Sequence, residues 1–374
     1  MAVEIVPYLP GHVPAVQAFN ARLHSAGVAE AFGMRSLLPE ASGSDPIPGS
    51  RIHEELFLAV DGDAVRGGYT LKHQDFTVNG VPTSIGFFRQ AVSEGTIDKR
   101  YVLIGPRLLR DALRREPRIY ALGIGGYDQA ATRLLKGARF EFVTAPFYFR
   151  VEHAGRFLRE VRPVRSSKAR RVASDVAAAT GLGTLVIAVL QLYRMGLSRD
   201  RARASAANMS SFGAWADTVW EAARGGFALG AVRDLALLAQ LYDGPDNPFI
   251  KVSIEAADGP RGWAVCLATQ RTDDKYFGNL KLGSIVDLLA VPGYERALVK
   301  AAVARLRQED VDLIVTNQTF RPVGEALRHG GFLSGPSNFL FAASPALAEA
   351  LRPLAANLPA FYLNRGDGDG PVNL

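Results

Sequence analysis

We predict an α+β protein in which two mixed-sheet domains are joined by a helical connector. The chain has 374 residues, more than one ordinary domain, and suits two of roughly 150 residues each. Strand, hairpin and helix patterns recur in the same order in both halves, and an uncharged apolar run lies between them. We place the first domain at 1–155, the basic and apolar connector at 156–211, the second domain at 212–345, and a C-terminal helix and tail at 346–374.

The composition describes a globular protein with room for real cores. Hydrophobic residues make up 48% of the chain and charged residues 21%. A single cysteine, Cys266, rules out an internal disulfide and suits a reducing compartment. The opening MAVEIVPYLPGHVPAV lacks a basic region followed by a continuous apolar core, so we see no secretory signal and expect a cytoplasmic protein.

The positive charge is concentrated around the connector. Net charge is +6, and the excess flanks the apolar run Val176 to Tyr193, with Arg159, Arg162, Arg165, Lys168, Arg170 and Arg171 before it and Arg199, Arg201 and Arg203 after it. We favour a helix buried between the domains. The alternatives are a helix in 165–197 held against anionic lipid at the inner membrane face, and a true membrane span. Little aromatic interleaving accompanies these bases, so nucleic acid is not an expected partner.

The first half shows an alternation of strand and helix patterns. Turn signals Asp61-Gly62-Asp63 and Asn79-Gly80 join successive hairpin strands, and Ser36 to Ser50 has the composition of a loop. We expect strands at Val3–Tyr8, Glu55–Val60, Gly68–His73, Phe76–Val78, Ile85–Val92, Ile119–Ile124 and Phe140–Val151, and helices at Val13–Leu23, Pro106–Arg115 and about Asp128–Lys136.

The stretch Ser84 to Leu109 combines an apolar strand, a short polar loop and the first turn of a helix. The first amides of a helix have no intrahelical acceptors, and the helix dipole makes that end partly positive. A pyrophosphate is well placed there. Pro106 lies in the first turn, where a proline costs least.

Within this stretch, Asp98 to Pro106 resembles the acyl-CoA signature of GNAT acyltransferases, in which Arg or Gln precedes two small residues. Arg100 and Gly105 fit this pattern, while Leu103 stands where the family has glycine. The resemblance implies an acyl-CoA donor whose pyrophosphate lies at Arg100, Leu103 and Gly105. It also implies that Val92 and Ser93 offer backbone groups to the pantetheine arm.

The end of the first half resembles the closing part of the GNAT core. The family has Asn, Ala, Leu, Tyr and a terminal Gly-Phe here, and this chain has Asp128, Ala131, Leu134, Leu135, Arg139 and Phe140. Leu135 therefore stands where the family often has the tyrosine that protonates the departing thiolate. Leucine cannot donate a proton.

The second half, from about Phe212 to Ala343, resembles another GNAT domain and is similar to bacterial proteins encoded near polysaccharide biosynthesis. Strands are expected at Phe249–Glu255, Gly262–Thr269, Gly283–Val291 and Asp312–Thr316, with helices to about Gln308 and around Val323–His329. Its cofactor loop is degenerate, because VPGYERALVK lacks the Arg or Gln and the two small residues. Leu327 takes the tyrosine position.

Three residues are candidates for accepting the proton of an amine nucleophile. Glu94 lies just beyond the central strand and His73 lies on the neighbouring hairpin, while Asp287 lies inside an apolar strand, where a charge is expensive unless paired. The histidines are scattered with no partner at metal-ligand spacing, so we expect no metal. Asp367-Gly368-Asp369 is expected to be a solvated tail.

The function we predict is acyl transfer from acetyl-CoA or another acyl-CoA to a small amine, such as an amino sugar or polysaccharide precursor. Two alternatives stay open. One is a non-catalytic GNAT-like scaffold or regulator that docks to a membrane or a partner through the connector. The other is FemAB-like aminoacyl transfer, which also pairs two GNAT-like halves and needs no good CoA loop. Neither the sequence nor its charge pattern indicates an oligomeric state.

Overall fold

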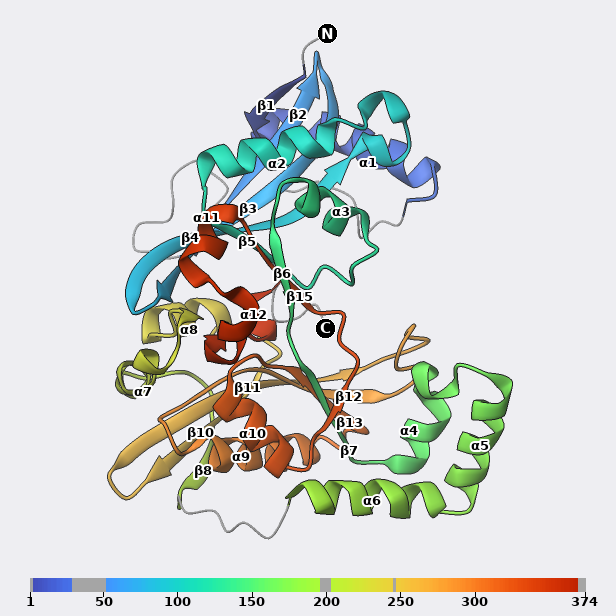
Figure 1. Cartoon of the computed structure of the whole chain (residues 1–374), viewed down its shortest axis with the longest axis vertical. Helices are drawn as coiled ribbons and strands as arrows, with labels where there is room; N and C mark the ends of the chain where they lie inside the picture. The colour runs from blue at the N-terminus through green and yellow to red at the C-terminus, as the bar shows by residue number, and fades with distance from the viewer. Residues whose placement is uncertain (1–2, 29–51, 196–202, 245–246, 369–374) are drawn as a thin grey trace. The chain divides into compact units, whose positions relative to one another are not determined.

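The chain forms two compact units in a computed structural model that describes residues 3–28, 52–195, 203–244 and 247–368 (Figure 1). Unit 1 comprises Met1–Thr144 and Asn338–Asn357, and unit 2 comprises Ala145–Ser337 and Leu358–Leu374. The connector predicted at 156–211 is part of unit 2. Each unit has a mixed sheet with helices packed against it, so the α+β prediction is confirmed.

The sheet of unit 1 has the strand order β1-β2-β3-β4-β5-β15-β6. Neighbouring strands are antiparallel except for β4 and β5, which are parallel. The predicted turns at Gly62 and Gly80 join the hairpins, and both glycines have positive φ. The strands are β1 Glu4–Pro7, β2 Ile52–Asp61, β3 Ala64–Val78, β4 Val81–Ser93, β5 Ile119–Leu122, β6 Glu141–Thr144 and β15 Leu340–Ala343.

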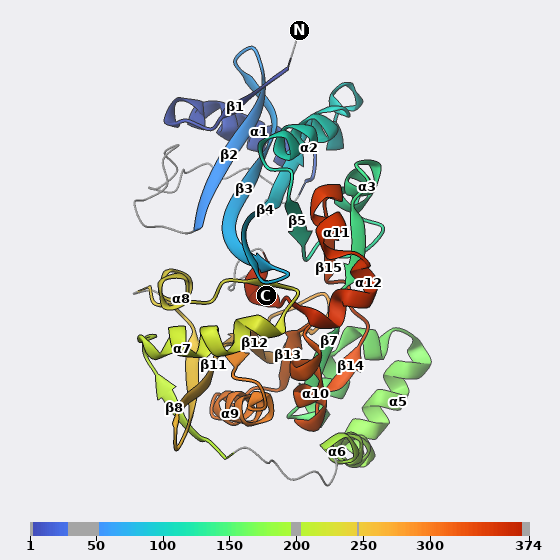
Figure 2. The ribbon, with the colours of Figure 1, turned by 60° about the vertical axis from the view of Figure 1, so that its left-hand side comes forward.

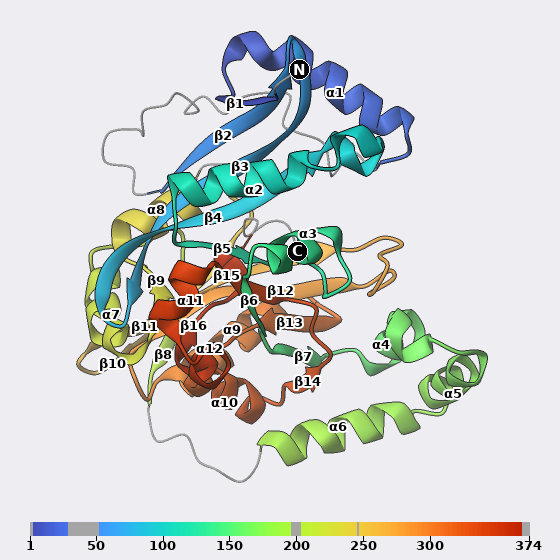
Figure 3. The same cartoon turned by 45° about the horizontal axis from the view of Figure 1, so that its top comes forward.

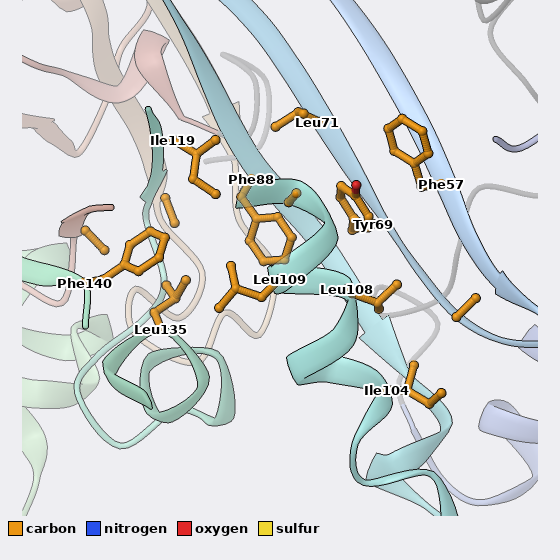
Figure 4. Close-up of a cluster of buried hydrophobic side chains, with 14 residues drawn as sticks. Phe57, Tyr69, Leu71, Phe88, Ile104, Leu108, Leu109, Ile119, Leu135 and Phe140 are labelled. Atoms are coloured by element: carbon orange, nitrogen blue, oxygen red, sulfur yellow. The ribbon is translucent and has the colours of Figure 1, made fainter. Parts of the chain in front are cut away.

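Helices cover both faces of this sheet because its strands alternate between two apolar sets. On one face, side chains of β2 and β3 pack against α1 (Val13–Ser25). On the other, α2 (Ile104–Arg115) places Leu108 and Leu109 against Phe88 and Tyr69 (Figure 4). Unit 1 also contains α3 Ala130–Gly137, α11 Pro345–Leu351 and α12 Leu354–Asn357.

The sheet of unit 2 has the order β14-β7-β13-β12-β11-β10-β8, with β12 and β13 parallel. Helices α9 and α10 lie beside each other against it (Figure 2). A short parallel pair, β9 and β16, belongs to the same unit. The elements are β7 Phe147–Val151, β8 Ser205–Met209, β9 Leu229–Ala231, β10 Ile250–Ala256, β11 Gly259–Gln270, β12 Lys281–Ala290, β13 Leu313–Asn317, β14 Leu333–Gly335, β16 Phe361–Tyr362, α4 Ala154–Glu160, α5 Lys168–Ala179, α6 Leu182–Met195, α7 Trp215–Ala223, α8 Leu235–Tyr242, α9 Glu295–Arg307 and α10 Arg321–His329.

The two sheets exchange one strand each. In unit 1, β15 lies between β5 and β6, although it comes some 200 residues later in the chain. In unit 2, β7 lies between β13 and β14. The single strand predicted over Phe140–Val151 is therefore two strands in different sheets, divided at Ala145-Pro146. Proline has no N–H to give to a strand ladder, which favours a break there.

The connector helix is not buried, contrary to our favoured interpretation. The apolar run spans α5 and α6, which are bent by 86° around Gly181 (Figure 3). Gly183 and Gln191 of α6 face the protein, whereas large apolar side chains are exposed, among them Leu182, Leu185, Val186, Val189, Leu190, Leu192 and Tyr193. No single helix among the described residues is long and apolar enough to cross a membrane, although the bent pair together meets that test of length and composition.

Candidate functional site in unit 1

The parallel strands β4 and β5 part midway along β4. Their register pairs only Gly86 with Ile119 and Phe87 with Tyr120, yet β4 continues to Ser93. Within the described residues, the end of β4 after Phe87 therefore has no strand partner on the β5 side. On that side, the strand ladder with β5 does not use its backbone groups.

A bulge lies in this part of β4, which still pairs with β3 on its other side. The register with β3 pairs Thr70 with Arg89 and Gly68 with Val92, so Gln90 and Ala91 together oppose one residue. Gln90 has a positive φ of 51°, and both bulge residues are exposed. Bulges of this kind redirect the chain and leave backbone groups unpaired.

Two short turns carry the chain from β4 to α2. Ser93 accepts a hydrogen bond from the Gly95 N–H at 3.1 Å, and Asp98 accepts one from the Arg100 N–H at 2.9 Å. α2 then begins at Ile104 after Leu103, which makes no side-chain cap. The first amides of α2 are therefore free of side-chain capping and suit an anion.

The residues assigned to the cofactor by resemblance gather at this junction. Val92 is buried at the end of β4, and Leu103 is exposed. Gly105 lies one residue into α2, where an added Cβ would meet only Leu134, at 3.8 Å. The Arg100 side chain is 81% exposed and pairs with Asp98, Nη2 to Oδ2 at 2.6 Å. Such a surface pair is weak, so a stronger anion can replace it.

Glu94 lies in the same loop but is held by two arginines. Its carboxylate accepts from Arg22 Nε at 2.8 Å and from Arg66 Nη1 at 2.9 Å. Burial acts to raise the pKa of Glu94, but these two hydrogen bonds outweigh it and lower the pKa. We therefore interpret Glu94 as an anchor that ties the loop to α1 and β3, more than as a base.

His73 lies in the closed part of the sheet. Its register partner on β4 is Gly86, seven residues before Ser93, which places it roughly 20 Å along the strand from the loop. His73 Nε2 is 2.7 Å from Glu55 Oε2, and its ring stacks on that of His53. The structure does not bring His73 together with the other predicted site residues.

Asp287 lies in unit 2, in a buried polar network. It accepts from Arg233 Nε at 3.0 Å, from the Tyr242 hydroxyl at 3.0 Å and from Asn364 Nδ2 at 2.6 Å. Arg233 also pairs with Asp367 at 3.0 Å. One guanidinium thus faces two buried carboxylates. Asp367 was predicted to be solvated, and this was wrong; Asp369 lies outside the described residues.

The C-terminal segment of unit 2 occupies the place that stays unpaired in unit 1. β12 pairs with β13 only from Leu282 to Ser284 and then continues to Ala290. β16 and the residue that follows it bond to both sides of this separation. The Tyr362 hydroxyl donates to the Leu288 carbonyl, and the Thr319 N–H donates to the Leu363 carbonyl at 3.1 Å. Unit 2 therefore has its own chain where a ligand would lie.

The two leucines at the tyrosine positions are buried. Leu135 packs in the core against α2, and Leu327 is fully enclosed in α10. Apolar side chains in these places add to packing and supply no acid. Neither position therefore provides a phenolic proton donor.

Several residues of these sites escaped prediction. Arg22, Arg66, Arg233 and Asn364 are each distant in sequence from the carboxylate they bind. The isolated acid within the apolar run SIVDLLAV did indicate that Asp287 needs a partner, but not which one. The bulge at Gln90 leaves no clear mark in the sequence.

Comparison with known proteins places the fold. No family model matches the sequence, and no curated protein matches it. Among solved structures, a GCN5-related N-acetyltransferase from Anabaena variabilis matches with a TM-score of 0.51 and 9% identity, over 91% of this chain and 72% of that one. The chain has the GNAT fold. A conserved protein from Enterococcus faecalis V583, described as a probable N-acyltransferase, matches with a TM-score of 0.51 and 7% identity over the same shares.

Both matches extend over 91% of this chain. Yeast N-myristoyltransferase with bound myristoyl-CoA is a further match, with a TM-score of 0.45 over 77% of this chain and 68% of that one. At these identities the likeness concerns the course of the backbone. Substrate and donor must be argued from this chain's own residues.

Proposed function

We propose that this protein is an acyl-CoA-dependent N-acyltransferase whose donor binds unit 1, between the end of β4 and the start of α2. One observation carries the proposal. In unit 1 the bulged end of β4 has no strand partner on the β5 side and leads to an uncapped helix start, whereas in unit 2 β16 and the residues that follow it occupy the corresponding place. A single donor per chain follows.

The reaction would rest on positioning. The amine nitrogen attacks the thioester carbonyl carbon, the carbon–sulfur bond breaks, and CoA leaves as a thiolate that takes a proton. In this proposal, backbone N–H groups at the Gln90–Ala91 bulge stabilise the oxyanion, and holding both reactants together lowers the barrier further. Because Leu135 has no proton to give, water would supply the thiolate's proton and take up that of the amine.

The resemblance supports a more specific proposal for the donor and for the acceptor. We propose acetyl-CoA as the first donor to test and a small amine or amino-sugar precursor of a polysaccharide as the acceptor. FemAB-like aminoacyl transfer stays an alternative, because that reaction needs no CoA loop. Retention of aminoacyl-tRNA at physiological salt without any CoA binding would favour it.

Calorimetric titration with acetyl-CoA and with free CoA tests the donor site. We expect micromolar binding of both at one site per chain, weakened at least about tenfold in Arg100→Glu by charge repulsion of the phosphates. Arg110→Glu on the exposed side of α2 makes the same charge change and is the matched control. Equal affinities in both variants, or no binding to the wild type, would overturn the proposal.

A second candidate, a scaffold that docks to anionic membrane, is favoured by α6. Its inward-facing residues include Gly183 and Gln191, while its outward-facing side chains are mostly Leu and Val. This is the reverse of a helix that packs its apolar stripe on the core. Large exposed apolar patches mark interaction surfaces.

Charge identifies a lipid surface as the occupant we propose. Exposed cations lie on the same two helices as the apolar side chains, namely Lys168, Arg170, Arg171 and Arg194. Arg199 and Arg201 lie outside the described residues. An apolar helix face rimmed by basic residues binds headgroups and acyl chains of anionic bilayers.

Sedimentation with vesicles tests this docking separately from catalysis. We expect binding to phosphatidylglycerol vesicles that weakens as salt rises and is weak with phosphatidylcholine. Leu185→Glu with Val189→Glu should abolish it, whereas Val81→Glu on the equally exposed hairpin of unit 1 should not. Absence of binding at low salt, or binding unaffected by the α6 variant, would end this candidate and leave a protein partner.

A further inference from the structure

Two histidines and a glutamate meet on the first hairpin of unit 1, although they are scattered in the sequence. His53 of β2 and His73 of β3 are direct cross-strand partners in the register. Their rings stack with centroids 4.4 Å apart and planes 12° apart. Directly opposed residues of antiparallel strands project to the same side of the sheet. The pairing therefore brings two imidazoles together by backbone geometry alone.

Glu55 completes the group. It lies two residues after His53 on β2 and so projects to the same face. Its Oε2 is 2.7 Å from His73 Nε2, and one ligand atom from each of the three residues lies within 4.8 Å of the others. Zn²⁺ takes such nitrogen and oxygen ligands at about 2.0–2.2 Å, so atoms this close together can share one ion once the side chains turn toward it.

Arg115 of α2 is the cation that acts on Glu55 from the neighbouring helix. Its charge is offset by its own ion pair with Asp111, Nε to Oδ2 at 2.7 Å. Metal binding requires neutral imidazoles and an ionised carboxylate.

We propose that His53, Glu55 and His73 bind a divalent transition-metal cation, with Zn²⁺ the best suited. Two imidazoles and one carboxylate match zinc and disfavour Mg²⁺ or Ca²⁺, which prefer oxygen ligands. Three protein ligands leave a fourth position for water or a substrate atom. The cation joins β2 to β3 in the closed part of the sheet, away from the β4 end, so the site is independent of the acyl-CoA proposal.

Titration of tag-free protein with Zn²⁺, followed by calorimetry, tests the site directly. We expect one cation per chain and an affinity that falls as pH drops below about 6.5, because protons compete for the imidazoles. Co²⁺ in place of Zn²⁺ should give the visible absorption bands of four-coordinate cobalt. These readouts do not depend on catalytic activity.

Conservative variants separate the site from adventitious binding. His53→Gln and His73→Gln should each weaken Zn²⁺ binding at least about tenfold, since even loss of an outer-shell partner costs about 10- to 100-fold. His24→Gln, on the exposed side of α1, is the matched control and should bind as the wild type does. Circular dichroism and acetyl-CoA titration check that each variant is folded.

Two results would overturn the proposal. One is wild-type protein that binds no Zn²⁺ at one equivalent per chain. The other is undiminished binding, with unchanged cobalt bands, in the folded His53→Gln, His73→Gln double variant. Wild-type protein that binds Zn²⁺ but not acetyl-CoA would count against the donor site and leave this one standing.

Discussion

Arg233 and Asp287 form an ion pair inside unit 2, with Arg233 Nε 3.0 Å from Asp287 Oδ1 and both side chains almost fully enclosed. The pair lies where β12 has parted from β13, and Asn364 of the C-terminal segment bonds to the same carboxylate. Burial of two charges is expensive unless each is paired and hydrogen-bonded. The pair therefore ties the closing segment to the sheet.

Arg233→Met should destabilise the protein by about 3–5 kcal/mol, because it leaves the carboxylates of Asp287 and Asp367 buried without their cation. Urea unfolding measures the loss. Arg224→Met breaks an exposed pair with Glu221 and is the control, with an expected change within about 0.5 kcal/mol. Similar free energies of unfolding for the two variants would contradict the role given to Arg233.

Asp367→Asn should alter how stability depends on pH. Burial raises the pKa of Asp367, although Arg233 opposes this. A folded-state pKa above the unfolded value means that this carboxyl contributes stability below the unfolded pKa, about 3.9, and loses it as pH rises through the folded pKa. Asparagine has no such loss. As pH rises from about 4, the free energy of unfolding of the wild type should therefore fall relative to that of the variant. A difference between the two proteins that does not change with pH would refute this.

Leu103→Gly should tighten CoA binding by a few-fold. The exposed leucine side chain lies beside the first amides of α2, and glycine lets a pyrophosphate approach them more closely. Val102→Gly removes an equally exposed apolar side chain one residue earlier and controls for added backbone freedom. Calorimetry that finds the same affinity in both variants would show that Leu103 does not limit the approach.

Glu94→Gln should loosen the loop between β4 and α2. The amide cannot form two ion pairs, and Arg22 and Arg66 lose their shared partner. Because both arginines are partly exposed, we expect a modest loss of about 1–3 kcal/mol in urea unfolding. Amide exchange in 94–101 should quicken as well. A variant with wild-type exchange there would show that Glu94 is not the anchor.

Gly183→Val should detach α6 from unit 2. A Cβ at Gly183 would overlap Leu158 Cδ1 of α4 and crowd Ala177 of α5, so a valine there should disturb the packing of α6 on these helices. Hydrogen exchange in α6 should then accelerate. Ala188→Val, on the exposed side of the same helix, carries a β-branched residue without this clash and should leave exchange nearly unchanged.

Features governed by neighbouring residues were predictable from the sequence. Asp61-Gly62-Asp63 and Asn79-Gly80 do form the turns between β2, β3 and β4, since glycine at positive φ suits such turns. Apolar spacing located α2 to within two residues. The strand, loop and helix at Ser84 to Leu109 are present as predicted, and the α+β fold with GNAT-like sheets follows from these local patterns.

Features that depend on distant partners were not predictable. Nothing near Asp367 indicates that Arg233 lies beside it, and nothing near His53 indicates His73, because strand register brings them together. The apolar run was expected to be buried, and this was wrong. Hydrophobicity shows that a segment avoids water, but it does not show what covers the segment. Gly183 and Gln191 are separated by a multiple of four residues, so they lie on one side of a helix. This spacing was the sign in the sequence of which face of α6 points inward.

The exchange of β7 and β15 bears on how the protein is made. The sheet of unit 1 cannot be completed until residue 343 has left the ribosome, long after its first strands. During synthesis, β5 and β6 are made before β15, the strand that pairs with both of them. Until β15 is made, their edges are open to other strands. If the gene were divided between the halves, each product would lack an inner strand of its sheet. The two halves therefore depend on each other to fold and have to be encoded in one chain.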